Sequence, residues 1–115
     1  MRPERIDSEI ETSIQAAVAI IRKARHLVAF TGAGISVESG VPPFRGPDGL
    51  WSSYDSKYLE LSYFHRHPDK CWRILKEIFY EHFAAAEPND AHRVLALLEA
   101  QGLLKAVITQ NIDSV

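Results

Sequence analysis

The feature that most limits how this chain folds is a short apolar run that passes directly into a glycine turn. Residues 8–25 carry apolar side chains at helical spacing, which predicts an amphipathic helix. Residues 27–30 predict a buried strand, and Gly32 and Gly34 follow it at once. Helix, buried strand and glycine turn in this order open an α/β nucleotide-binding unit. We therefore expect the α/β class, with a Rossmann-like parallel sheet.

The remaining chain predicts two more helices and a second strand. Residues 68–83 and 89–101 have apolar side chains at helical spacing, and residues 106–109 form a second apolar strand. Residues 36–66 are rich in glycine and proline, which break regular structure. The same segment carries large apolar side chains that favour burial, so we expect an ordered loop with an inserted helical part.

Three positions carry signals for helix ends. Ser8 and Glu11 have the spacing of a capping box, which predicts that Ser8 caps the first helix. Asn89 or Asp90 can cap the third helix, and Gly102 can end it.

Composition and charge exclude several classes of protein. The chain has 115 residues and a net charge of −2, which fits one domain or part of one and argues against a strongly basic nucleic-acid surface. Its one cysteine, Cys71, can form neither an internal disulfide nor a four-cysteine zinc site. No apolar run has the length of a membrane span, and residues 1–7 lack the apolar core of a signal peptide. We expect a cytoplasmic protein that binds neither membrane nor nucleic acid.

The five histidines do not show a metal-binding spacing. His65 and His67 lie near Cys71 and could suggest a metal site, but a solvated start of a helix is favoured. We expect that His92, beside the apolar face of the third helix, is structural.

The first candidate site is the turn at residues 32–36, here called the glycine corner. Glycines allow a sharp turn and a close approach of backbone to ligand, and a following helix would direct free N–H groups at a pyrophosphate. The dinucleotide fingerprint requires a third glycine where Val37 stands, and no P-loop element is present. A plain tight turn therefore stays an alternative.

The second candidate site comprises residues 110–113, here called the polar corner. These residues follow the second strand, and open parallel sheets bind ligands outside the carboxyl ends of their strands. The two amides and the carboxylate can pair with ribose hydroxyls or with a carboxamide. The alternative is a polar end of a strand that caps a helix.

The third candidate site is the loop at residues 42–46. Arg45 can hold a phosphate through its fork of donors, and Phe44 can shield a reactive ring from water. Taken alone, this segment favours the alternative, a packed loop with one surface arginine.

These motifs together resemble the sirtuins, a family of NAD-dependent protein-lysine deacylases. Residues 32–51 resemble the family's signature, and residues 109–113 look like its second cofactor motif. Residues 88–92 are similar to the start of the helix that precedes the family's second strand. The likeness runs in order from about residue 20 to residue 115.

The resemblance implies NAD as the cofactor and gives roles to single residues. Phe44 would cover the nicotinamide, and Arg45 would help to hold the phosphates. The two amides of the polar corner would contact the adjacent ribose, and Ile112 with Asp113 would bind the carboxamide. The cofactor-binding residues implied in this way are Gly32, Ala33, Gly34, Ile35, Ser36, Val37, Phe44, Arg45, Gln110, Asn111, Ile112 and Asp113.

The implied activity is removal of acyl groups from lysine, with release of nicotinamide and acyl-ADP-ribose. The substrate would be an acetylated-lysine protein or peptide, since Leu75 and Ile78 stand where desuccinylases carry a tyrosine and an arginine. The general-base histidine is expected beyond Val115, so this chain would hold no catalytic residue and would be an inactive N-terminal portion. Zinc is expected for the full-length family, but its cysteine ligands are absent from this sequence.

The resemblance also implies a division of the chain. Residues 1–46 and 87–115 would belong to the NAD-binding domain, and residues 47–86 to a smaller helical domain. Two positions depart from the family pattern: Pro43 would stiffen the loop, and Val37 would remove one polar contact.

Two other functions are compatible with the residues. A non-catalytic module that binds NAD or ADP-ribose fits the missing histidine. An NAD-linked oxidoreductase would require the third glycine and an acidic residue at the end of the second strand.

Overall fold

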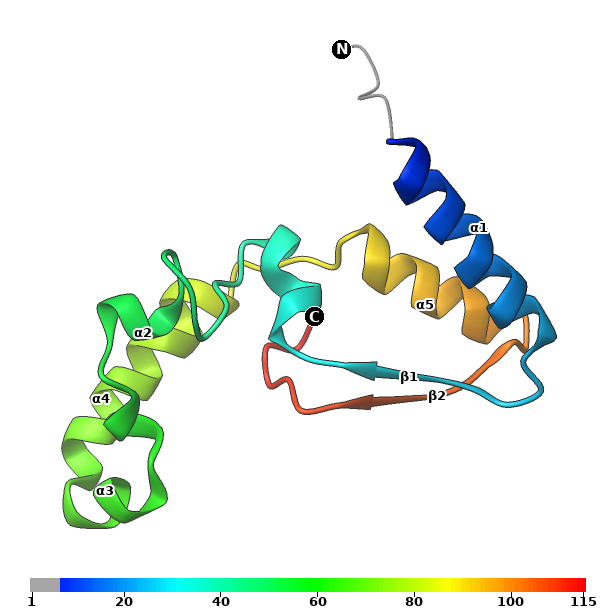
Figure 1. Ribbon diagram of the computed structural model, residues 1–115. Helices are drawn as coiled ribbons and strands as arrows, with labels where there is room; N and C mark the ends of the chain where they lie inside the picture. The colour runs from blue at the N-terminus through cyan, green and yellow to red at the C-terminus, as the bar shows by residue number, and fades with distance from the viewer. Residues whose placement is uncertain (1–6) are drawn as a thin grey trace.

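A computed structural model describes residues 7–115 as an α/β chain with one small parallel sheet (Figure 1). The expectation that residues 1–7 are not a signal peptide falls mainly on residues 1–6, outside the described residues. The elements are α1 Ser8–Lys23, β1 Leu27–Thr31, η1 Ala33–Ser39, α2 Leu50–Ser53, η2 Ser56–Leu59, α3 Leu61–Arg66, α4 Pro68–Glu77, η3 Ile78–Phe83, α5 Asp90–Ala100 and β2 Leu104–Thr109.

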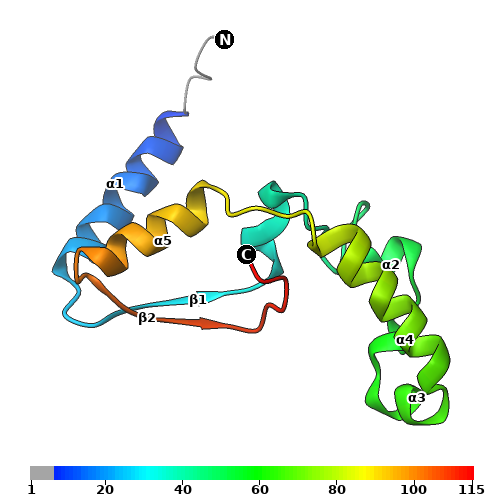
Figure 2. The ribbon, with the colours of Figure 1, turned by 180° about the vertical axis from the view of Figure 1, so that it is seen from behind.

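The parallel sheet confirms the expected fold class. β1 pairs with β2 in parallel, from Leu27 opposite Leu104 to Thr31 opposite Thr109. Helices α1 and α5 lie on the same side of the two strands, and both views agree on this (Figures 1 and 2). Because the strands are parallel and adjacent, their carboxyl ends meet at one edge.

The first helix differs from its prediction at both ends. Asp7, not Ser8, is the N-cap, and its carboxylate accepts from the backbone N–H of Glu9 at 3.4 Å. The carboxylate of Asp7 thus takes the position that the capping-box spacing gave to Ser8. The helix ends at Lys23 because Ala24 is extended, with φ −65° and ψ 132°. The prediction for Asn89 is confirmed, since its side chain caps α5.

Residues 36–66 are more regular than the sequence predicts. The segment holds four short helical stretches, η1, α2, η2 and α3, and its glycine and proline positions lie between η1 and α2. Gly40 ends η1 with φ +85°, a value that glycine adopts without strain. The segment is an ordered loop, as expected, but it is built from turns too short for a periodic pattern to reveal.

The described residues form two groups of elements (Figures 1 and 2). One group is the sheet with α1 and α5, and the other holds α2, α3 and α4. The buried core lies where the loop, η3 and the C-terminal segment meet, and consists of Val41, Leu50, Ile78 and Phe83. The division into two domains at residues 46 and 86 stays a prediction.

The chain is extended for its length. Its Cα radius of gyration is 18.0 Å, whereas a compact chain of this size has about 13 Å. Large apolar side chains are therefore exposed, and Phe30 on β1 is 74% exposed. Within residues 7–115, no helix combines the length and apolar character needed to cross a membrane.

Candidate functional site

The glycine corner and the polar corner lie side by side, because each follows the carboxyl end of one of two paired strands. Thr31 and Thr109 face each other at the last paired position. Just beyond them, Asn111 Nδ2 donates a hydrogen bond to the carbonyl oxygen of Gly32 at 2.9 Å. This bond joins the two corners directly, although its partners lie 79 residues apart in the sequence.

A cleft of about 80 Å³ lies between the corners. Ala33 and Asp113 both line it, so the corners face a shared space. The polar side chains of the cleft come from the polar corner, and apolar side chains form the remaining wall. The lining residues are Ala33, Val41, Pro42, Phe44, Phe83, Gln110, Asn111, Ile112 and Asp113. An apolar wall with a few convergent polar groups is typical of a small-molecule site.

Phe44 forms one wall of the cleft and is held by the residues that follow it. Its ring stacks on Trp51, with centroids 5.5 Å apart and an angle of 26°. The carbonyl oxygen of Phe44 accepts from the N–H of Trp51 at 3.0 Å, and that of Pro43 accepts from the N–H of Leu50 at 2.7 Å. The first turn of α2 thereby fixes the loop that carries Phe44.

Gly49 allows this loop to close. It is buried, and a Cβ at this position would lie 2.7 Å from the carbonyl carbon and oxygen of Arg45. Any side chain larger than hydrogen would therefore push the loop apart. Arg45 itself lines an open groove beside the cleft, together with Ala33, Phe44 and Trp51.

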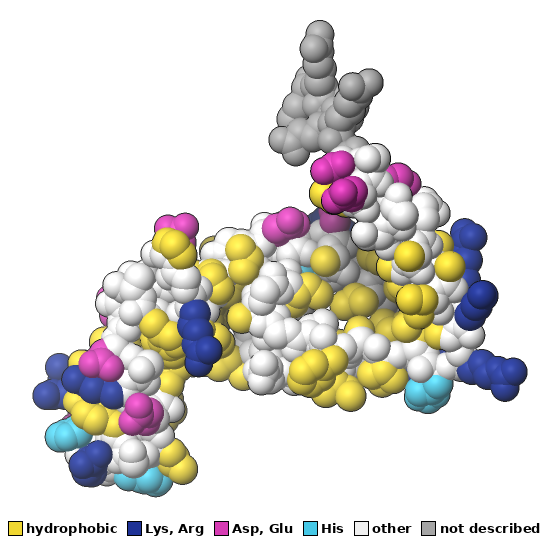
Figure 3. All heavy atoms as spheres, in the orientation of Figure 1, with side chains coloured by type: hydrophobic (Ala, Val, Ile, Leu, Met, Phe, Trp, Pro, Cys, Tyr) yellow, Lys and Arg dark blue, Asp and Glu magenta, His cyan; other side chains and the backbone are white. Residues whose placement is uncertain are grey.

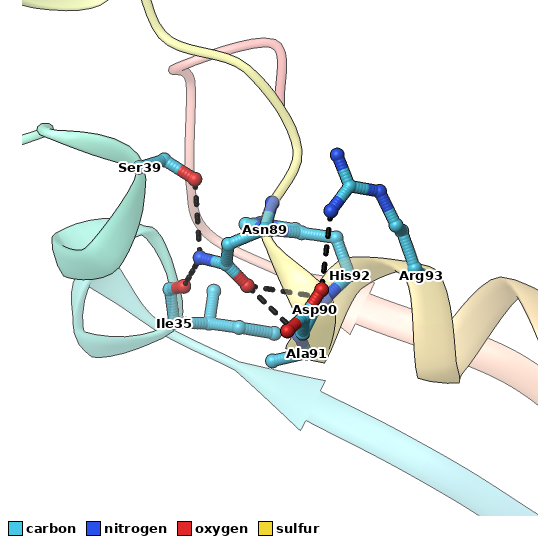
Figure 4. Close-up of polar contacts among 7 residues, drawn as sticks. All are labelled: Ile35, Ser39, Asn89, Asp90, Ala91, His92 and Arg93. Atoms are coloured by element: carbon cyan, nitrogen blue, oxygen red, sulfur yellow. Dashed lines mark hydrogen bonds and ion pairs between the residues drawn. The ribbon is translucent and has the colours of Figure 1, made fainter. Parts of the chain in front are cut away.

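A polar network behind the glycine corner connects η1 to α5 (Figure 4). Asn89 Nδ2 donates to the carbonyl oxygen of Ile35 at 2.7 Å and to Ser39 Oγ at 3.1 Å. His92 Nε2 lies 3.5 Å from Ser36 Oγ, and Ser36 is fully buried. The start of α5 thus supports the short helix that begins in the cleft.

The charged groups near the cleft are few. Asp113 lines it, and its Oδ1 accepts from the N–H of Val115 at 3.2 Å. Among the described residues, no group of three or more His, Cys, Asp and Glu side chains could hold a metal ion.

Tyr54 contacts the core next to the loop and stays neutral over a wide pH range. Burial is the main cause that raises the pKa of its phenol, and the carboxylates of Glu77 and Glu81 raise it further. Its hydroxyl lies 3.5 Å from His82 Nε2. Tyr54 therefore acts as a hydrogen-bonding group and not as a charge.

Comparison with known families agrees with this geometry. A model described as the Sir2 family matches residues 32–115, which is most of the chain and includes both corners and the loop. The chain belongs to the Sir2 family. The resemblance to sirtuins in the sequence is thereby confirmed.

Curated Sir2 relatives cover almost the whole chain but are longer than it. The NAD-dependent protein deacylase 2 of Archaeoglobus fulgidus is 50% identical over 105 residues, which are 90% of this chain and 41% of the relative. The NAD-dependent protein deacetylase of Sulfolobus acidocaldarius is 47% identical over 82% of this chain and 37% of its own length. The chain spans about two fifths of the length of these relatives.

Solved Sir2 structures share the fold. One, a Sir2 protein with a deacetylated p53 peptide and 3′-O-acetyl ADP ribose, aligns with a TM-score of 0.81 at 42% identity, over 87% of this chain and 40% of its own. A second, with a p53 peptide and NAD⁺, aligns with a TM-score of 0.75 at 42% identity, over 87% of this chain and 39% of its own.

The structure brings many of the residues predicted for the Sir2 site together. Six of them line the central cleft, Ile35 lines an adjoining cavity of about 190 Å³ with Asn111 and Asp113, and Arg45 lines the open groove. Gly32, Gly34, Ser36 and Val37 line none of these three spaces, and Gly32 meets the polar corner only through its carbonyl oxygen, which accepts from Asn111. The side chain of Ser36 points into the protein against His92, and Val37 is 43% exposed.

Sequence reasoning left two residues of the cleft wall outside every candidate site. Val41 and Phe83 belong to the core and line the cleft as well. Pro42 lines it beside Phe44. Phe83 ends η3, a π-helical turn. The cleft residues of the loop lie about 40 positions earlier in the sequence, and no local pattern connects Phe83 with them.

Proposed function

We propose that this chain forms the nicotinamide-side part of the NAD site of a Sir2-type, NAD-dependent protein deacetylase. The observation that carries the proposal is the shared cleft of Ala33 and Asp113 at the carboxyl ends of two paired parallel strands. That position is where open α/β sheets bind nucleotides.

The residues present fit a nicotinamide nucleotide. An aromatic ring with a carboxamide needs an apolar wall and a few polar groups at one edge, and the cleft offers Phe44 and Ile112 beside Asp113. The Asp113 carboxylate can accept from the carboxamide NH₂, and Gln110 can pair with a ribose hydroxyl. When bound, NAD supplies nicotinamide as a leaving group at its ribose. Phe44 would exclude water from the exposed ribose carbon.

The substrate proposal rests on relatives. Those described above are named as NAD-dependent protein deacetylases or deacylases, and two of the solved neighbours contain p53 peptides. We extend this to an acetylated-lysine protein or peptide as the substrate of the protein to which this sequence belongs. The isolated 115-residue polypeptide should bind ligand without appreciable turnover, because we expect its general base outside this sequence.

Titration calorimetry of the chain with NAD and with ADP-ribose tests the proposal. Asp113→Asn should weaken NAD binding by about fivefold to tenfold, since a neutral amide oxygen accepts a hydrogen bond worth ~0.5–1.5 kcal/mol where the carboxylate accepts one worth ~1.5–3 kcal/mol. The same change should leave ADP-ribose affinity almost unaltered, because ADP-ribose lacks the carboxamide. The matched control is Asp90→Asn, whose carboxylate pairs with Arg93 on the surface of α5.

The outcomes separate the candidate functions. Absence of binding by the unaltered chain, or equal loss of both ligands in Asp113→Asn, would contradict the assigned site. A non-catalytic ADP-ribose module would bind NAD and ADP-ribose with equal affinity, and Asp113→Asn would change neither affinity. Reduction of NAD, followed by absorbance with candidate alcohols, would instead indicate an oxidoreductase.

A further inference from the structure

We propose that Phe83 is a specificity-determining residue for the nicotinamide ring, and that the π-helical turn η3 is the device that brings its side chain to the cleft. Phe83 is 8% exposed, belongs to the buried core and lines the cleft together with Phe44 and Ile112. The inference rests on the proposed function, because it gives a wall of that same cleft a role in choosing the ligand.

The hydrogen bonds show that the helix widens after α4. The N–H of Ile78 donates to the carbonyl oxygen of Ile74, four residues earlier, as in an α-helix. The N–H of Ala84 instead donates to the carbonyl oxygen of Phe79 at 3.0 Å, five residues earlier. A turn closed by a bond of this length along the chain is π-helical and holds one residue more than an α-helical turn.

The extra residue changes which side chain faces the core. Ile74 and Ile78 are four residues apart and both pack in the core, which is the spacing of one face of an α-helix. The same spacing would next bring Glu81 or His82 to this face. The π-turn brings Phe83 there instead, five residues after Ile78, and leaves Glu81 exposed.

The cleft gains an apolar wall from this change of register. Of the three side chains that end the turn, only Phe83 lines the cleft. An α-helical turn would direct the Glu81 carboxylate towards it, and an unpaired charge is costly to bury. His82 has a polar partner elsewhere, since its Nε2 lies 3.5 Å from the Tyr54 hydroxyl. The Phe83 ring is supported by Phe79, edge to face, with centroids 5.3 Å apart and an angle of 85°.

A ring in this wall discriminates between two ligands of the proposed site. NAD carries a nicotinamide ring that can pack on Phe83, whereas ADP-ribose has no nicotinamide. By calorimetry, Phe83→Leu should weaken NAD binding about threefold to tenfold, the effect of one lost aromatic pair, and leave ADP-ribose binding almost unaltered. The matched control is Tyr80→Ala, which removes a 72% exposed ring from the same turn and should change neither affinity.

The two ligands separate a role in specificity from a structural role. Loss of the Phe83 ring from the core alone would weaken both ligands to the same extent. Equal weakening of NAD and ADP-ribose in Phe83→Leu, or unaltered affinity for NAD, would therefore overturn the inference.

Two length variants test the register of the turn. Deletion of Tyr80 leaves Phe83 four residues after Ile78, so a regular α-helix would carry the ring to the same wall and NAD affinity should be kept. Insertion of one alanine after Tyr80 places Phe83 six residues after Ile78, which neither an α-turn nor a π-turn returns to this face. The insertion should weaken NAD at least as much as Phe83→Leu. Equal effects of the deletion and the insertion would contradict the role of η3.

NMR of the two length variants tests the register without any ligand. Phe83 and Val41 belong to the same core and line the same cleft, so nuclear Overhauser contacts are expected between the Phe83 ring and the Val41 methyl groups. These contacts should persist after the deletion and disappear after the insertion. Their loss in the deletion variant, or their persistence in the insertion variant, would refute the role of η3. If the unaltered chain binds neither NAD nor ADP-ribose, the proposed function fails, and this comparison still decides whether η3 places Phe83.

Discussion

Gly34 and Gly49 lie in the two segments that carry cleft residues, the glycine corner and the loop after Phe44, but each is a glycine for a different physical reason. A Cβ on Gly49 would meet the backbone of Arg45 at 2.7 Å, whereas a Cβ on Gly34 would find nothing within 4 Å. Glycine at position 49 is therefore required by the fold of the loop. Glycine at position 34 leaves open space at the glycine corner, which suits the close approach of a ligand.

Gly49→Ala should destabilise the chain. The added methyl group has to displace the backbone of Arg45 and Phe44, and overpacking of this kind costs about 1–3 kcal/mol. Urea unfolding followed by Trp fluorescence measures the change, and Trp51 also reports on the loop through its stacking with Phe44. An unfolding midpoint equal to that of the unaltered chain would contradict the proposed close contact.

Gly34→Ala should show the opposite pattern. Since nothing lies near the added methyl group and the backbone of Gly34 needs no positive φ, stability should hold or rise by about 0.4–1 kcal/mol. Affinity for ADP-ribose should fall if the ligand packs against this backbone. Calorimetry beside urea unfolding gives both values, and unaltered affinity would move the ligand away from the glycine corner.

Single residues also show which parts of the candidate site could be predicted from the sequence and which could not. The glycine corner and the polar corner could be found because each directly follows an apolar strand, a purely local signal. Ser36 shows what a local signal lacks: its side chain belongs to the motif but is buried against His92, 56 positions away. Its direction depends on a helix–helix contact that spacing does not encode.

At the scale of elements, β1, β2 and α5 were predicted almost to their ends, because their apolar spacing extends over several residues. Residues 68–83, predicted as one helix, instead form α4 and the π-helical turn η3, because apolar spacing does not show where the hydrogen-bond pattern changes. The short turns α2, η2 and α3 were not predicted, because a turn of four to six residues has no period to detect. Asp7 replaced Ser8 as the cap of α1, since both residues can fill that position and the backbone geometry decides between them.

Asn89 acts in two elements at once, and one substitution separates the two roles. Aspartate caps helices as well as asparagine does, so Asn89→Asp should preserve the cap of α5. It removes the Nδ2 donor that binds Ile35 and Ser39, and leaves the carbonyl oxygen of Ile35 facing a carboxylate. We expect a loss of about 1–3 kcal/mol from this unpaired, partly buried acceptor.

Asn89→Ala provides the comparison for this prediction. It removes the cap and both bonds to η1, so it should cost more than Asn89→Asp by about 0.5–2 kcal/mol, the value of an N-cap. Thermal or urea unfolding of both variants measures the difference. If Asn89→Asp were as stable as the unaltered chain, the bond between Asn89 and η1 would contribute nothing.

At the scale of the whole molecule, the sheet has one covered face and one open face. Helices α1 and α5 cover one side, and Figure 3 shows apolar side chains gathered along the other. Phe30 and Ile108 are paired across the strands and are 74% and 54% exposed, and Val28 follows on the same face of β1 at 38%. Contiguous apolar surface of this kind promotes association in water.

The last prediction concerns this open face. The 115-residue chain should associate as its concentration rises, and Phe30→Lys should suppress that association, because a charge in the centre of the apolar face would have to be desolvated on contact. Leu61→Lys is the matched control, since Leu61 is 71% exposed but lies on α3, in the other group of elements. Sedimentation velocity over a concentration series measures both variants. Equal association of the two would show that the open face of the sheet does not drive it.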